Sequence, residues 1–293
     1  MTSTFVVDRS ERGKLALTGA EAKDFLQGQV TNDILGLTPG RGCYAAFLTH
    51  KGKMLGDMRV FDLGDELLLD CERVVLQELF NMIRRFKLGR EVELHKRTVE
   101  LALFSIVGPD APRLAGPNEH DNARVVLGGA QVTAVTTDVG TDLFCAAEDK
   151  EAVRAALDLP DADEAQAEIV RVESGRPRYG VDLDDSVIPQ EAGLNERAVS
   201  FTKGCYVGQE TVARLYYRGK PNRRLLGLRL SEPAPPGTEL RLGEKVVGKL
   251  GSVVVSPEHG PIGLAIVRRE ANPGDTVQVD GVTGLIVDIP FAR

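Results

Sequence analysis

Apolar residues in the first hundred positions recur partly at the two-residue spacing of strands and partly at the spacing of a helix. Strands are predicted at residues 14–17, 43–48, 54–63 and 66–70, and helices at 20–30 and 74–86. The second helix is strongly amphipathic and carries Arg84, Arg85 and Lys87 near its end. This succession predicts an α+β layer on an antiparallel sheet.

The middle of the chain continues in mixed α/β character. Strands are predicted at 100–107, 125–127, 131–136 and 143–146, a short helix at 111–115 and a longer one at 149–157. The acidic, proline-bearing stretch 159–164 is typical of a connector. Helices are then predicted at 165–174 and 211–217, on either side of a Gly/Pro-punctuated loop.

After residue 224 the pattern changes to short strands separated by Gly/Pro turns. They are predicted at 225–230, 239–241, 245–256, 261–267, 276–279 and 282–287. Regularly spaced short strands of this kind predict a small antiparallel barrel, with its boundary near Pro221.

Composition narrows the class of function. The 293 residues carry a net charge of −7, which argues against general nucleic-acid binding. A local basic cluster, Arg214 to Arg224, is either a solvated helix end or a site for an anionic ligand. No apolar run approaches the roughly 18 residues of a membrane span and no secretory signal is visible, so a cytoplasmic protein without membrane contact is expected.

The four cysteines and four histidines are scattered along the chain. No C-x-x-C pair or comparable histidine spacing occurs, so neither a metal site nor a disulfide framework is predicted. Reduced thiols are the simplest expectation.

One stretch, Lys203-Gly204-Cys205-Tyr206-Val207-Gly208-Gln209-Glu210, is chemically unusual. Cys205 is predicted near the N-terminus of the following helix and beside Lys203, a setting that favours a thiolate. Gly204 is expected to give the backbone its freedom ahead of that helix, with Glu210 in the first turn. The alternative is an inert cysteine buried in a tight turn.

This stretch resembles the Lys-Gly-Cys-Tyr-x-Gly-Gln-Glu signature of the YgfZ-type folate-binding proteins, relatives of the glycine-cleavage T-protein (aminomethyltransferase). Residues 25–33 and 44–53 are similar to the N-terminal region of the same family. The T-protein branch has two adjacent aspartates where this chain has Gly56-Asp57. The resemblance implies that Asp57 faces a folate, although an edge-strand or turn role is equally open, and the missing carboxylate argues against aminomethyl transfer.

A second stretch, Arg171 to Asp182, is suited to hydrogen bonding with a planar ligand. A helix carboxylate beside a loop rich in Arg and Tyr can accept paired hydrogen bonds from the amino-pyrimidinone edge of a pterin. The resemblance assigns that role to Glu173, with Arg171 and Tyr179 nearby and Lys203 as a further contact. Glu191 matches the Pro-x-Glu segment of the family and is either a polar wall of the site or a loop-anchoring carboxylate.

The resemblance implies a multi-lobed, T-protein-like α+β fold with antiparallel sheets and a small C-terminal β-barrel. The expected division is an N-terminal α+β lobe at 1–98, a middle α/β lobe at 99–160, a folate-site and cysteine-motif segment at 161–221 that completes the N-terminal unit, and a barrel at 222–293.

The function favoured by the resemblance is that of a tetrahydrofolate-binding accessory factor for iron–sulfur cluster assembly or repair, linked to tRNA modification. Its ligand would be tetrahydrofolate or a derivative in a cleft between lobes, and iron–sulfur assembly or client proteins are the expected partners. Cys205, Asp57 and Lys203 are the expected catalytic residues. A folate-dependent aminomethyl or methyl transferase and a non-enzymatic scaffold are the alternatives, and a role without turnover is favoured over an enzyme.

Overall fold

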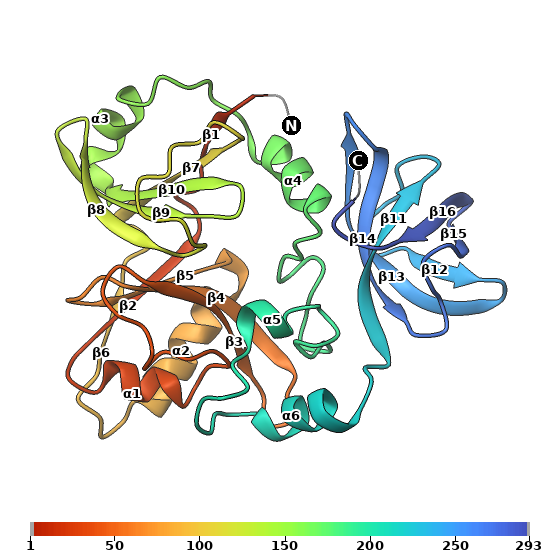
Figure 1. The fold of residues 1–293 in the computed structure, drawn as a ribbon, viewed down its shortest axis with the longest axis horizontal. Helices are drawn as coiled ribbons and strands as arrows, with labels where there is room; N and C mark the ends of the chain where they lie inside the picture. The colour runs from red at the N-terminus through yellow and green to blue at the C-terminus, as the bar shows by residue number, and fades with distance from the viewer. Residues whose placement is uncertain (1–2, 292–293) are drawn as a thin grey trace. The chain divides into compact units, whose positions relative to one another are not determined.

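The computed structural model describes residues 3–291, which form two compact units. The first contains the chain up to His50, together with Leu55–Glu164 and Arg197–Val207. The second contains Lys51–Met54, Ala165–Glu196 and the chain from Gly208 onward. Both units contain antiparallel strands, which are labelled in Figure 1.

The first unit is built on two five-stranded sheets. One has the strand order β1-β7-β10-β9-β8, with bounds Phe5–Asp8, Leu101–Val107, Gly140–Ala146, Ala130–Thr136 and Asn122–Leu127. The other has the order β3-β4-β5-β2-β6, with bounds Gly42–Leu48, Met54–Asp62, Leu67–Cys71, Gly13–Thr18 and Glu93–Lys96. The recorded pairings are antiparallel, so successive strands need only short turns.

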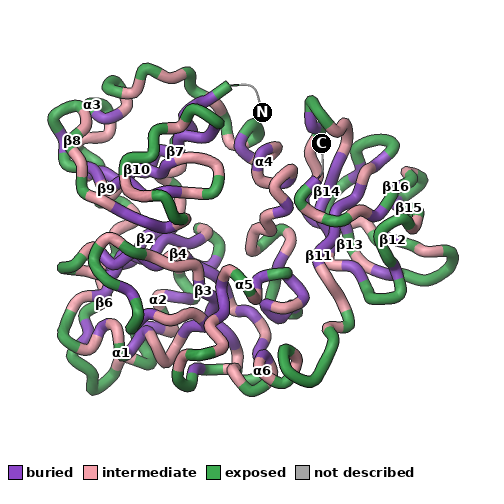
Figure 2. The backbone as a smooth tube through the Cα atoms, in the orientation of Figure 1, coloured by how far each residue is buried: buried purple, intermediate pink, exposed green. Residues whose placement is uncertain are grey.

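Buried side chains from both sheets form a common core. Phe61 and Leu68 of one sheet pack with Leu103, Val135 and Phe144 of the other. The rings of Phe61 and Phe144 lie 5.8 Å apart and are tilted, a favourable aromatic arrangement. This cluster joins the two sheets of the first unit, and buried residues line the strands in Figure 2.

Short helices complete the first unit. Their bounds are Ala22–Gln27 for α1, Leu76–Phe86 for α2 and Lys150–Ala155 for α3, with single 3-10 turns η1 at Arg73–Val75 and η2 at Ala147–Asp149. Helix α2 buries Leu79 and Ile83, spaced one turn apart, and exposes its opposite face. The predicted amphipathic helix is thus confirmed.

The second unit contains α4 (Glu164–Glu173), α6 (Gln209–Arg218) and a closed six-stranded barrel; α5 (Asn195–Ala198) spans the boundary of the units. The barrel order is β11-β14-β13-β12-β15-β16, with bounds Arg223–Leu230, Gly260–Arg268, Lys245–Ser256, Glu239–Leu242, Thr276–Val279 and Val282–Val287. Its interior is filled by aliphatic side chains such as Leu228, Leu240 and Val267. Closure leaves the sheet without an edge.

The predicted fold class is confirmed: a mixed structure with antiparallel sheets and a C-terminal barrel. The short helix expected at 111–115 is wrong: the segment runs as a loop, and the Pro112 carbonyl accepts a hydrogen bond from Thr141 Oγ1 and does not close a helical turn. The backbone freedom expected at Gly204 is used instead at Gly208, which has φ 85° immediately before α6.

Candidate functional site

Asp57 is a buried carboxylate in β4 of the first unit. The Tyr44 hydroxyl, on β3, donates a hydrogen bond of 2.6 Å to its Oδ2. Burial raises the pKa of Asp57 to about 6; the Tyr44 hydrogen bond opposes this rise, and the nearby Glu72 carboxylate adds to it. Asp57 is therefore poised to gain or lose a proton near neutral pH.

Gly56, the neighbour of Asp57, faces the other side of the sheet. A Cβ added there would lie 3.4 Å from Val75 and 3.5 Å from Leu79, the apolar residues that precede and begin the buried side of α2. Because successive strand residues point to opposite faces, a carboxylate at position 56 would meet this apolar packing and not join Asp57. Gly56 is therefore weaker evidence against aminomethyl transfer than its difference from the paired aspartates of the T-protein branch suggested.

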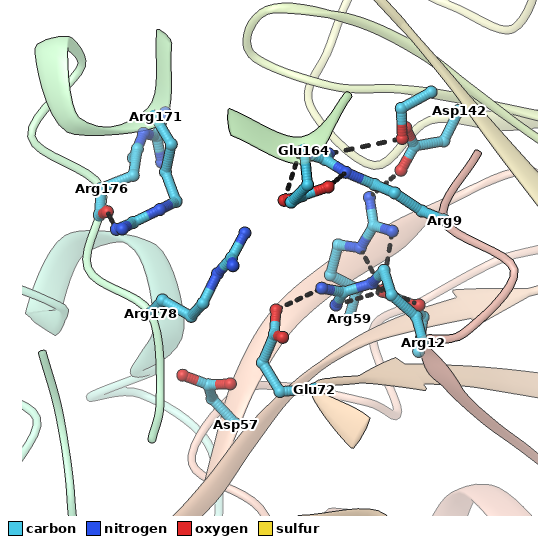
Figure 3. A network of polar contacts seen from close by, with 12 residues as sticks. Arg9, Arg12, Asp57, Arg59, Glu72, Asp142, Glu164, Arg171, Arg176 and Arg178 are labelled. Carbon is cyan, nitrogen blue, oxygen red and sulfur yellow. Dashed lines mark hydrogen bonds and ion pairs between the residues drawn. The ribbon is translucent and has the colours of Figure 1, made fainter. Parts of the chain in front are cut away.

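Arginines and carboxylates form a buried network in the first unit (Figure 3). Arg12 and Arg59 both donate to Asp70, whose side chain is fully buried, and Arg59 also pairs with Asp142 at 2.5 Å. Burial alone would raise the pKa of Asp70, but the two guanidinium groups outweigh it and hold that pKa at about 2. Arg12 also contacts Glu72.

The segment before α6 is fastened to the turn that follows α1. The Lys203 ammonium donates to the carbonyl oxygens of Gln27, Val30 and Asn32 at 2.6, 2.8 and 2.6 Å. Val207 N–H donates to the Gly28 carbonyl. Burial lowers the pKa of Lys203 to about 8. Three carbonyl acceptors use the three ammonium donors, so Lys203 holds the segment before α6 against the turn after α1.

Cys205 is the only exposed cysteine among residues 3–291. Because α6 begins at Gln209, Cys205 lies four positions before the helix: it is near the helix N-terminus, as predicted, but outside the first turn, where the helix dipole acts. Burial raises the pKa of Cys43 to about 12 and that of Cys145 to about 11. Those thiols are inert by comparison with a solvent-accessible one.

Arg171, in α4 of the second unit, is committed to protein partners. Its Nε and Nη2 donate to Glu168 at 2.8 and 2.7 Å, and Nη1 donates to Asp182 at 2.9 Å. The remaining donors contact the Arg176 carbonyl and Ser252 Oγ (Figure 3 shows the contact with Arg176). A guanidinium has five N–H donors, so this arrangement leaves none for a ligand.

Glu173, at the end of α4, has a different environment. Ser256 Oγ donates to its Oε1 at 2.6 Å. Within residues 3–291 its second oxygen, Oε2, accepts no hydrogen bond. An oriented carboxylate with one open oxygen fits the paired donors of a pterin edge.

Glu191 lies in the loop 187–194, which precedes α5. Its carboxylate accepts two hydrogen bonds from Arg223, at 3.0 and 2.8 Å, and one from Ile188 N–H at 3.2 Å. This geometry favours loop anchoring. Tyr179 donates to the Met54 carbonyl at 3.4 Å, near the limit of a hydrogen bond.

Two residues that sequence reasoning missed are Gln190, in the same loop, and Asn195, the first residue of α5. The side-chain oxygens of Gln190 and Asn195 are buried and have no hydrogen-bond partner among the described residues. A buried acceptor without a donor is costly, so these oxygens suit a ligand or water. No periodic signal marks them, because only tertiary burial makes them unusual.

Within residues 3–291, no group of three or more His, Cys, Asp or Glu residues is arranged to hold a metal ion. No helix of the described chain is long and apolar enough to cross a membrane.

Both ends of the chain match known domain families. Residues 1–126 match the GCVT N-terminal domain, and residues 222–291 match the CAF17 C-terminal β-barrel domain. The tRNA-modifying protein YgfZ of Colwellia psychrerythraea is 27% identical over 94% of this chain and 88% of its own length. A chloroplastic protein of Arabidopsis thaliana, named as a transferase, is 27% identical over 98% of this chain and 71% of its own.

Among solved structures, the chain is similar in fold to the glycine cleavage system aminomethyltransferase T from Bartonella henselae. The TM-score is 0.86 over 99% of this chain and 86% of that one, at 19% sequence identity. The similarity covers both sheets and the barrel, so the whole architecture is shared.

Proposed function

We propose that the chain, whose residues 1–126 match the GCVT N-terminal domain and 222–291 the CAF17 C-terminal β-barrel domain, is a tetrahydrofolate-binding accessory factor for iron–sulfur cluster assembly or repair. The relative named as a tRNA-modifying protein supports a link to tRNA modification. The observation that carries the folate assignment is Glu173, whose carboxylate is oriented by Ser256 and keeps one oxygen open.

The proposed roles follow from the contacts of each side chain. Glu173 would accept hydrogen bonds from the pterin edge, and a bound folate would supply a carrier for one-carbon units. Asp57, with its pKa of about 6, would exchange a proton with a folate nitrogen. Arg171 and Lys203 would position the segments that carry Glu173 and Cys205, because their donors are already used.

Calorimetric titration with tetrahydrofolate and with 5-formyl-tetrahydrofolate tests the ligand. We expect saturable binding by the wild type and a loss of tenfold or more in Glu173→Ala, since hydrogen bonds to a charged group contribute about 1.5–3 kcal/mol each. Glu232→Ala, which removes an exposed carboxylate of the barrel unit, is the matched control and should bind normally. Equal affinities in both variants would refute the Glu173 assignment.

Cys205 is tested separately. Cys205→Ala should bind folate as the wild type does but fail to restore function in a deletion strain, because the only exposed thiol of residues 3–291 would be lost. Cys145→Ala, at a buried thiol, is the control for general thiol loss. Full complementation by Cys205→Ala would remove the role proposed for the cysteine motif.

A folate-dependent one-carbon transferase is the second candidate. The retained, buried Asp57 favours it, as does the finding that a side chain at Gly56 would face α2. Mass-spectrometric detection of a folate-bound one-carbon unit during turnover, lost in Asp57→Asn, would place this candidate first. Absence of any folate binding would instead leave the non-enzymatic scaffold.

A further inference from the structure

The end of α2 is strongly basic although the chain is acidic overall. Residues Leu79–Arg90 contain four basic side chains and no acidic one, in a protein with a net charge of −7. Lys87 donates to a backbone carbonyl and Arg90 pairs with Glu21. The other two are Arg84 and Arg85, both exposed and without a carboxylate partner among residues 3–291.

Exposed apolar side chains accompany these arginines. Phe86 is 51% and Leu88 80% exposed. The Arg85 guanidinium lies 5.8 Å from the centre of the Phe86 ring. Basic residues at a helix C-terminus are explained by the helix dipole; here an exposed aromatic ring and an exposed leucine adjoin them and add apolar area to the same surface.

We propose that this surface, defined by Arg84, Arg85, Phe86 and Leu88 and called the α2 surface, binds RNA. A guanidinium matches a phosphate with two parallel hydrogen bonds. An exposed aromatic ring next to arginine offers a stacking face to an unpaired base. The class of partner rests on the tRNA role in the proposed function, whereas the surface itself is independent of Glu173 and the folate.

The composition of the α2 surface favours RNA over other partners. A stable protein interface buries about 800 Å² on each side around an apolar centre, which two apolar side chains do not supply. Membrane attachment through basic residues needs a second hydrophobic signal of comparable strength. Two unpaired arginines with one ring meet the smaller requirement of phosphate contact plus a single stacked base.

Fluorescence anisotropy with an unmodified tRNA transcript tests the inference on the full chain. We expect wild-type binding that weakens with salt, and at least tenfold weaker binding by the double variant Arg84→Gln/Arg85→Gln. Loss of two phosphate contacts should also reduce the slope of log K against log salt by about 2. Arg268→Gln/Arg269→Gln, at two adjacent exposed arginines of the second unit, is matched in charge and should bind as the wild type does.

A second variant separates stacking from charge. Phe86→Ala should weaken binding about tenfold with an unchanged salt slope, and Phe86→Trp should restore it. The inference is overturned if the wild type does not bind tRNA at 100 mM salt, if the control pair loses as much affinity, or if only phosphatidylserine vesicles are bound. Folate titration of the same variants distinguishes the two proposals: intact folate binding without RNA binding removes this inference alone.

Discussion

Asp57→Asn should make the first unit more stable at neutral pH, because the native protein keeps an acidic group in a buried position. The pKa of Asp57 rises from 3.8 to about 6, mainly through burial. Native Asp57 therefore holds its proton more tightly than the unfolded chain does. Its contribution to stability is complete below pH 3.8, declines as pH rises through 6, and is then lost.

The size of the effect follows from the shift. Each unit of pKa corresponds to about 1.4 kcal/mol, so the shift of about 2 units is worth roughly 3 kcal/mol in full. Asparagine does not titrate, and its oxygen can still accept the Tyr44 hydrogen bond. The unfolding free energy of Asp57→Asn minus that of the wild type should therefore increase by about 2 kcal/mol between pH 4 and pH 7.5.

Urea unfolding followed by circular dichroism measures this difference, since the chain has no tryptophan to report by fluorescence. Asp24→Asn makes the same substitution at an exposed carboxylate of α1 and should show little pH dependence. A pH-independent difference for Asp57→Asn would mean that the Asp57 environment does not disfavour the ionised form. The proposed proton exchange with a folate would then lose its physical basis.

Three further predictions concern groups held by tertiary contacts. Arg171→Met should lower the unfolding free energy by about 3–5 kcal/mol, measured by urea unfolding, because the fully buried Asp182 loses its cation. The control Arg268→Met, at an exposed arginine, should change the unfolding free energy little. Equal losses in the two variants would contradict this account. Lys203→Met should lower the unfolding free energy by about 2–3 kcal/mol and speed proteolysis near residue 203, since three carbonyl oxygens lose a charged donor. If the variant resisted protease as well as the wild type does, the contacts of Lys203 would not hold this segment. His120 is buried and its pKa falls from 6.5 to about 4, so its stabilising contribution is present above pH 6.5 and is lost as pH falls through 4. Asparagine tolerates the φ of 73° at position 120, so His120→Asn should fold normally. Between pH 6.5 and pH 4, its unfolding free energy should fall by about 3 kcal/mol less than that of the wild type. Parallel acid-unfolding curves for the two proteins would refute the lowered pKa of His120.

Local patterns in the sequence predicted much of the architecture. The amphipathic spacing around Leu79 and Ile83 predicted α2, and the regular turns after residue 224 predicted the barrel. Two four-residue strands, β1 and β6, escaped prediction, whereas the equally short β12 and β15 were predicted because Gly/Pro turns flank them.

The sequence by itself determined the periodicity of the main elements, the cysteine motif and the similarity to T-protein-like proteins, because these depend on residues adjacent in the chain. Only the tertiary structure decided that Arg171 is fully used by protein acceptors, that Lys203 binds the turn after α1, and that a side chain at Gly56 would face α2. The acidity of Asp57 likewise depends on burial and on Glu72, which lies fifteen positions away in the sequence. Burial and long-range partners set hydrogen bonding and pKa, and neither is encoded in local spacing.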